Sequence, residues 1–153
     1  MQSLGHALYR VAITVWVGGL WVIGYLAAPT LFYRLADRAL AGNLAGAMFS
    51  TLAWTGIVCA VYIVLFLCIR HGVRVFSLGA FWLTLLMLAL TLVGLFGIQP
   101  IVARLTAQSW PKSVMESVAR DRFAMWHGIS SVLYLVQSVL GLVLVLVQDK
   151  GRR

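Results

Sequence analysis

The sequence predicts an all-α integral membrane protein: a four-helix transmembrane bundle with a short interfacial amphipathic helix between its third and fourth helices. Of the 153 residues, 62% are hydrophobic and only 10% are charged, and the mean hydropathy is +0.96. These values exclude an ordinary soluble domain. Four windows lack Asp, Glu, Lys and Arg, and each exceeds the roughly 20 residues that a helix needs to cross the hydrocarbon core. The windows are residues 11–33, 39–69, 75–103 and 123–148.

Each window predicts one membrane-spanning helix, and together the helices form a single domain over residues 1–153. Arg10 precedes the first apolar run, as in a signal peptide, but the run is too long for one and contains Trp16, Trp21 and Tyr25. We therefore expect this helix to be retained, and an even number of crossings places both termini on the same side. The helices are expected near residues 8–30, 45–69, 76–98 and 123–147.

The first connection, residues 32–48, contains small residues spaced four apart. Gly42 and Gly46 are one such pair, and this spacing allows two backbones to approach closely in lipid. Pro29 lies just before the connection and is expected to kink or end the first helix. A break there would free backbone carbonyls, which need partners inside the protein or in a wet cavity.

The third connection carries the signals of a helix start. Ser109 precedes Trp110 and Pro111, which is a Ser cap with a proline in the first turn. Apolar residues then recur at helical spacing up to Val118, with charged residues between them. The pattern predicts a short amphipathic helix near residues 110–120, lying in the membrane interface or covering the end of the bundle as a lid.

The charges exclude several classes of function. The net charge is +8, but the basic residues are scattered between apolar segments, which favours lipid headgroups as their partners and excludes nucleic acid. Four acidic residues leave little for paired carboxylate catalysis. No phosphate loop, Cys-x-x-Cys pair or nucleophile elbow is present, so an enzyme of familiar type is not expected. Cys59 and Cys68 are interpreted as small hydrophobic residues.

The strongest functional signal is a polar stripe on the predicted fourth helix. Its members recur at steps of three and four, so they share one face, which is expected to point toward the other helices and away from lipid. A weaker set on the first helix includes Thr14, Trp21 and Tyr25. The stripe consists of His127, Ser130, Ser131, Tyr134, Gln137, Ser138 and Gly141.

Two interpretations of these residues stay open. In the first, one polar cavity lies between the first and fourth helices, and Pro29 opens its mouth. In the second, the side chains are closed against each other and against backbone carbonyls, which adds about 0.6 kcal/mol for each hydrogen bond. Two roles are likewise open for His127. It either binds a ligand or handles a proton, or it is an interfacial histidine that hydrogen-bonds to neighbouring serines. The residues of the cavity would be His127, Ser130, Tyr134, Gln137, Thr14, Trp21 and Tyr25.

A bis-histidine haem is the alternative cofactor, since the sequence otherwise predicts none. His6 and His71 are expected at the same end of the bundle, where a pair is geometrically conceivable. His127 is expected at the opposite end without a histidine partner. The methionines and cysteines show no clustered spacing that would predict a soft-metal site.

Several short motifs carry a family resemblance. They are Trp16-Val17-Gly18-Gly19-Leu20, Ala28-Pro29-Thr30-Leu31-Phe32, Ala41-Gly42, Phe49, and Phe123-x-x-x-His127-Gly128-x-Ser130. In this order and spacing the chain resembles the bacterial family called domain of unknown function 4149, and it is similar to the eukaryotic transmembrane protein 205 group. The resemblance implies a four-helix membrane protein without an assigned activity. The eukaryotic group is associated with handling of a platinum drug, which implies traffic of a metal or small solute.

The four-span layout also resembles, more distantly, membrane proteins of the copper-resistance D and haem-synthesis oxidase types. Those families depend on histidines within their helices, whereas this chain offers His6 only at the start of its first helix. Two functions therefore remain. The first is a small non-enzymatic protein of the bacterial inner membrane that binds a small solute or metal, or that assembles as a homo-oligomer or with a membrane-protein partner. The second is a haem-binding redox protein.

The basic residues also predict the topology. Six lie at the termini and in the turn at residues 70–74, and six lie on the opposite side. The first group occupies shorter segments, and this higher density favours a cytoplasmic location for both termini. A reporter fused after Arg153 should therefore be active only in its cytoplasmic form. Activity of a periplasmic reporter at the same position would reverse the assignment.

Overall fold

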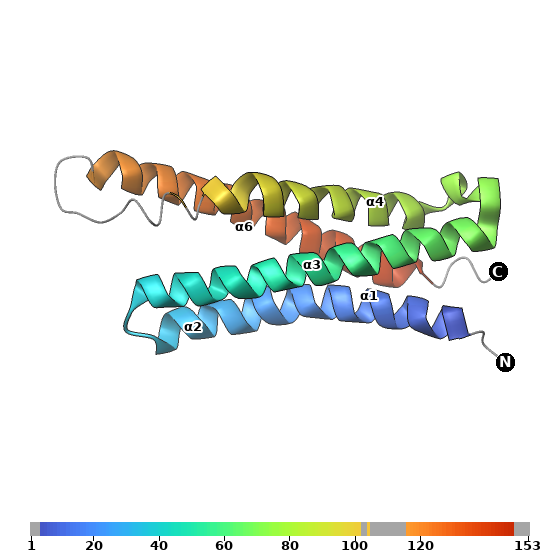
Figure 1. Cartoon of the computed structure of the whole chain (residues 1–153), viewed down its shortest axis with the longest axis horizontal. Helices are drawn as coiled ribbons and strands as arrows, with labels where there is room; N and C mark the ends of the chain where they lie inside the picture. The colour runs from blue at the N-terminus through green and yellow to red at the C-terminus, as the bar shows by residue number, and fades with distance from the viewer. Residues whose placement is uncertain (1–3, 102–103, 105–115, 149–153) are drawn as a thin grey trace.

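The computed structural model describes residues 4–101, 104 and 116–148, and for Arg38 and residues 116–124 it describes the backbone alone. Four long apolar helices, each long enough to cross a membrane, run up and down in one bundle, which confirms the predicted fold class (Figure 1). The elements in chain order are α1 (Leu4–Val22), η1 (Ile23–Ala27), α2 (Ala28–Arg34), α3 (Arg38–His71), η2 (Gly72–Ser77), α4 (Gly79–Leu92), η3 (Val93–Ile98) and α6 (Glu116–Val147).

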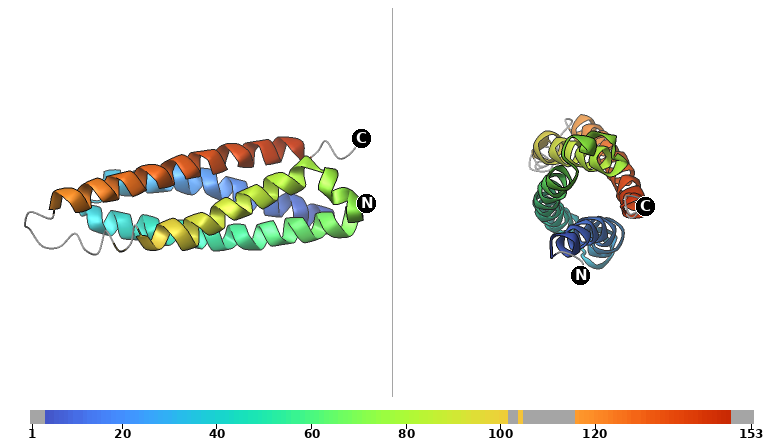
Figure 2. Two further views of the ribbon diagram at one scale, coloured as in Figure 1. Left: turned by 90° about the horizontal axis from the view of Figure 1, so that it is seen from above. Right: turned by 90° about the vertical axis from the view of Figure 1, so that its right-hand side faces the viewer.

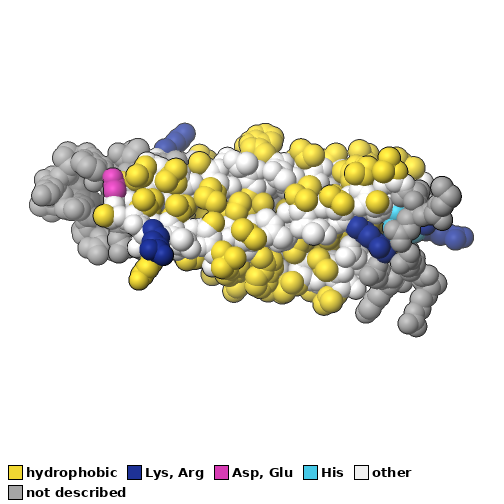
Figure 3. Space-filling view, turned by 90° about the horizontal axis from the view of Figure 1, so that it is seen from below, with side chains coloured by type: hydrophobic (Ala, Val, Ile, Leu, Met, Phe, Trp, Pro, Cys, Tyr) yellow, Lys and Arg dark blue, Asp and Glu magenta, His cyan; other side chains and the backbone are white. Residues whose placement is uncertain are grey.

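The two ends of the bundle differ in what they hold. The start of α1, the η2 turn and the end of α6 lie together at one end, here called the terminal end (Figure 1). The α2–α3 turn, the end of η3 and the start of α6 lie at the opposite end, here called the distal end. Hydrophobic side chains cover the length between the ends, and Lys and Arg side chains gather toward both ends (Figure 3). This distribution is that of a protein surrounded by hydrocarbon and flanked by headgroups.

The first connection is much shorter than the sequence suggested. Helix α2 ends at Arg34 and α3 begins at Arg38, so the expectation of a connection over residues 32–48 and a helix beginning near residue 45 was wrong. The physical reason is Asp37, whose Oδ1 accepts hydrogen bonds from the backbone amides of Ala39 at 2.8 Å and Leu40 at 3.2 Å. This cap satisfies two amides of the first turn and starts the helix early.

The predicted helix at residues 110–120 lies mostly outside the described residues. Only its last part, from Glu116 onward, is described, and there the backbone already belongs to the continuous helix α6.

Pro29 does not end the first membrane-spanning helix, which continues to Arg34. Instead the backbone opens into the π-helical turn η1 just before the proline, where the Ala28 amide donates to the carbonyl of Ile23, five residues earlier. Proline has no amide proton, and its ring collides with the carbonyl four residues before it. A wider π turn relieves this conflict without breaking the helix.

A second π-helical turn precedes a proline in the third membrane-spanning helix. Here η3 ends at Ile98, two residues before Pro100, just as η1 ends two residues before Pro29. Both helices run from the terminal end toward the distal end, so both π turns lie in the distal half of the bundle (Figure 1).

The four helices form a ring in which α1 packs against α3 and α6, and α4 packs against the same two helices (Figure 2). A side-chain hydrogen bond joins each neighbouring pair in this ring. The donors are two tyrosines and two glutamines, which reach a backbone carbonyl or a hydroxyl on the next helix. The bonds are Tyr62 Oη to Gly5 O, Gln99 Nε2 to Gly46 O, Gln137 Nε2 to Thr91 Oγ1, and Tyr134 Oη to Leu20 O.

Packing is unequal along the bundle. The fully buried large side chains extend from the terminal end to the middle of the membrane, and include Trp16, Ile63 and Met87. Beyond the middle, over residues 24–50, 93–101 and 125–133, Ile98 is the largest buried side chain among those described, and the other buried ones are alanines. The terminal half is therefore tightly filled, whereas the described part of the distal half is loosely packed.

The tight packing of the terminal half predicts a large difference between two glycines. A methyl group added at Gly56 would overlap the indole of Trp16, which is 1% exposed, whereas one added at Gly18 would meet nothing within 4 Å. Gly56→Ala should destabilise the fold by about 1–3 kcal/mol through overpacking. The control Gly18→Ala should be neutral or stabilising by up to about 1 kcal/mol because alanine favours the helix. Thermal unfolding in detergent measures both, and an equal melting temperature for the two variants would contradict the packing described.

Candidate functional site

The polar stripe of α6 passes from the loosely packed half of the bundle into the filled half. At its distal end His127 and Ser131 are exposed, and Ser130 is half-buried. At its terminal end Gln137 and Ser138 are buried. The stripe therefore has an accessible part and an inaccessible part, and Tyr134 lies at the boundary between them.

Tyr134 makes the contacts that join α6 to the first membrane-spanning helix. Its hydroxyl donates to the backbone carbonyl of Leu20 at 2.6 Å. Its ring lies directly over Gly24 in η1, where any added methyl group would overlap the ring. On the other side the ring meets Phe49 of α3 edge-on, with centroids 5.1 Å apart. Tyr134 is thus held by three elements at once and closes the centre of the bundle at this depth.

An aromatic group continues from Tyr134 to the surface. The ring centroid of Tyr25 lies 6.3 Å from that of Tyr134 and 4.9 Å from that of Trp21. Tyr25 and Trp21 are 40% and 38% exposed. Of the residues that the sequence assigned to a cavity, these three are brought together, along the seam between η1 and α6.

Gln137 takes a different direction from Tyr134. Its side-chain amide donates to Thr91 Oγ1 of α4 at 2.6 Å, and the Thr91 hydroxyl donates in turn to the carbonyl of Met87 at 2.8 Å. Gln137 therefore joins α6 to α4 and does not lie in the seam with η1.

The hydroxyl groups of the expected site mostly bond to their own helices. The exposed Thr14 donates to the Arg10 carbonyl at 2.9 Å. Ser130 and Ser131 both donate to the carbonyl of His127, at 2.9 and 2.8 Å. The serines thus contact the backbone of His127, and Thr14 is not brought next to the other candidates.

Two more of the candidate residues lie farther toward the distal end. Pro29 and His127 are both exposed there. Gly24 and Phe49 were not assigned to the site from the sequence, although both contact the ring of Tyr134 and Phe49 belongs to the motifs of the family resemblance. The signal for Gly24 was its position five residues before a proline in a helix, where a π turn relieves the proline's conflict.

The described residues contain no group of three or more His, Cys, Asp and Glu side chains placed to hold a metal ion. His6 stands near the start of α1 and His71 at the end of α3, both at the terminal end, whereas His127 lies toward the distal end. The ring of His6 packs beside those of Tyr9 and Phe66, each with a centroid 5.9 Å away.

A family model described as "Domain of unknown function (DUF4149)" matches residues 11–111, which is more than half of the chain. No curated protein and no solved structure matches it. The wider resemblances to the transmembrane protein 205 group and to the copper-resistance D and haem-synthesis oxidase types therefore stay predictions.

The contact between Tyr134 and Leu20 can be measured by removing one oxygen atom. Tyr134→Phe keeps the ring over Gly24 but loses the hydrogen bond, which should lower the free energy of unfolding by about 0.6 kcal/mol, the average for such bonds between membrane helices. Tyr33→Phe is the matched control because Tyr33 is 86% exposed, and it should leave stability unchanged. Steric-trap or denaturant unfolding in bicelles measures both. Equal stability of Tyr134→Phe and the native protein would show that the bond contributes nothing.

Proposed function

The chain belongs to the DUF4149 family, and from its geometry we propose that it is a non-enzymatic, multi-pass membrane protein that binds a small solute in the distal half of its bundle. The solute site lies along the seam between η1 and α6. Tyr134 forms its floor, Tyr25 and Trp21 form its wall, and His127 and Ser130 lie toward its mouth.

The observation that carries this proposal is the unequal packing. Large side chains fill the bundle from the terminal end up to the depth of Tyr134, and beyond it the buried side chains among the described residues are alanines and Ile98. A folded interior normally leaves few voids larger than a water molecule. A half-bundle with so few large buried side chains therefore favours occupation by water or a ligand.

The chemistry of the mouth favours a neutral solute that donates hydrogen bonds. Pro29 supplies no amide to the carbonyls of the preceding turn, and at membrane depth such carbonyls need water, protein or ligand partners. The described charged side chains at the distal end include Arg34, Arg104 and the carboxylate of Asp37, which caps α3. Together these three side chains carry a net charge of +1, which disfavours a bare metal cation.

The proposed topology determines where the solute enters. With both termini in the cytoplasm of a bacterial cell, the distal mouth opens on the outer side of the inner membrane. Assembly with a partner protein is the alternative use of the same surface, and it would cover the seam without requiring a wet interior.

Cysteine accessibility tests the proposal directly. Cys59 and Cys68 are first replaced by alanine, and single cysteines are then introduced on α6 in place of Ser130, Ser138 and Val132. Ser130→Cys should react with a charged, membrane-impermeant methanethiosulfonate reagent at least tenfold faster than Ser138→Cys, because Ser138 is 1% exposed and a thiol reacts as its hydrated thiolate. Val132→Cys is the lipid-facing control, since Val132 is 61% exposed on the outer surface, and it should also be slow.

Two results would overturn the solute site. If Ser130→Cys is as unreactive as Ser138→Cys in the folded protein, the distal half is dry and filled. If all three cysteines react at the same rate, the reagent reports general opening of the bundle and not a seam that admits water.

A further inference from the structure

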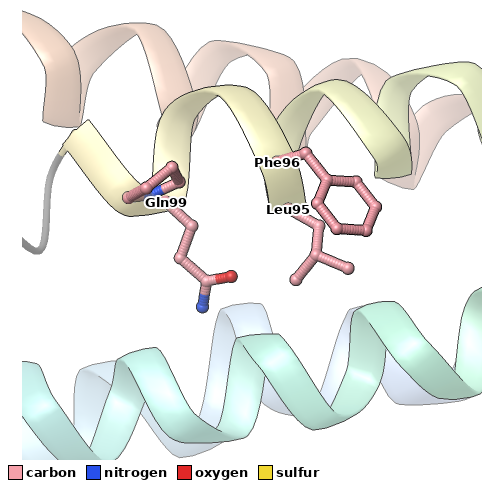
Figure 4. A pocket seen from close by; sticks show the side chains of 4 residues that line it. Leu95, Phe96 and Gln99 are labelled. Carbon is pink, nitrogen blue, oxygen red and sulfur yellow. The ribbon is translucent and has the colours of Figure 1, made fainter.

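A second feature of the distal half lies between α3 and η3, the pair of helices opposite the seam in the ring. It is a hollow of about 420 Å³ lined by Leu95, Phe96, Gln99 and Pro100 (Figure 4). It is shallow and open to the outside over most of its extent. Phe96 is 62% exposed and Pro100 is also exposed, so the hollow opens on the outer surface of the bundle.

The part of α3 next to Gln99 carries two glycines. The amide of Gln99 points toward α3 (Figure 4) and donates to the backbone carbonyl of Gly46 at 3.1 Å. A methyl group added at Gly46, or at Gly42 one turn away, would meet nothing within 4 Å. Helix α3 therefore presents bare backbone beside the hollow, and no described side chain occupies the space over these glycines.

The two ends of the hollow differ in the side chains beside them. Toward the middle of the membrane, Trp54 of α3 meets Phe96 edge-on, with ring centroids 6.2 Å apart and planes at 89°. Toward the distal end, Arg104 follows Pro100 by four residues, the spacing of about one helical turn, and its side chain is exposed. From the membrane centre outward, the surface thus carries the aromatic rings of Trp54 and Phe96 first. Apolar side chains and the amide of Gln99 follow, and the cationic Arg104 comes last.

We propose that this hollow binds an anionic phospholipid, with an acyl chain against Phe96 and Pro100 and the phosphate on Arg104. The apolar part of the surface would face the acyl chain, and the cationic part would face the phosphate of the headgroup. A guanidinium is suited to phosphate because it donates hydrogen bonds in a fixed fork. A helix of a second copy is about 10 Å across, and the exposed rings of Trp54 and Phe96 at the edge of the hollow would obstruct its approach. A lipid chain is thinner and is therefore favoured.

The proposal is tested with the purified full-length protein in neutral detergent after removal of bound lipid. Native mass spectrometry follows titration with phosphatidylglycerol and, separately, with phosphatidylcholine of the same acyl chains. Phosphatidylglycerol should bind about fivefold more tightly, the factor expected for one arginine facing an anionic lipid surface. Arg104→Gln should remove this preference, whereas Arg74→Gln, which changes an exposed arginine at the terminal end, should retain it.

A second pair of variants tests the position of the acyl chain. Gly46→Leu adds a large side chain on α3 beside Gln99 and should weaken binding of both lipids at least fivefold, whereas Gly18→Leu, which adds the same side chain at an open glycine of α1, should not. If Gly46→Leu fails to fold, Gly42→Leu takes its place, because Gly42 makes no hydrogen bond to Gln99. Equal affinity for both lipids in the native protein, or unchanged lipid binding in Gly46→Leu, overturns the proposal. A dimer that is lost in Gly46→Leu would also overturn it and assign the hollow to a second copy.

Discussion

The structure depends on one requirement of the hydrocarbon environment: polar groups inside the membrane must find partners within the protein. Most hydroxyl groups satisfy this requirement within their own helix. The Thr84 hydroxyl, for example, donates a hydrogen bond to the carbonyl of Ala80, four residues earlier. Tyrosine and glutamine are long enough to reach the next helix, and their four bonds close the ring of α1, α3, α4 and α6. Such bonds contribute about 0.6 kcal/mol each. They therefore act mainly by setting which helices are neighbours and at what depth they align.

The two prolines explain why the halves of the bundle differ. Pro29 and Pro100 each follow a π turn in a helix that runs toward the distal end. A π turn changes the direction of the side chains beyond it, so apolar residues after the turn no longer continue the face that packs in the terminal half. Gly24 lies within η1 and admits the ring of Tyr134. Tight packing ends at this depth, and the described distal half buries mostly alanines.

The loosely packed half supports two proposals on opposite sides of the ring. The seam beside Tyr134 combines aromatic rings with polar groups, which favours a small solute. The hollow beside Gln99 combines exposed rings, bare glycine backbone and an arginine, which favours a lipid. Both depend on the same observation, because the described distal half buries few large side chains.

The sequence by itself determined the class of fold and the four crossings, because spanning a hydrocarbon layer imposes a length and a composition that can be read along the chain. It also contained the cap at Asp37, but the connection expected over residues 32–48 did not use this cap as a helix start. The polar stripe of α6 was visible as well, and the structure brings Tyr134 together with Tyr25 and Trp21, while Thr14 stays exposed on its own helix. Only the tertiary structure decided that Tyr134 reaches α1 whereas Gln137 reaches α4. Helical periodicity defines a face about 100° wide, and in a ring of four such a face touches two neighbours, so the partner of each side chain depends on how the helices are arranged around it.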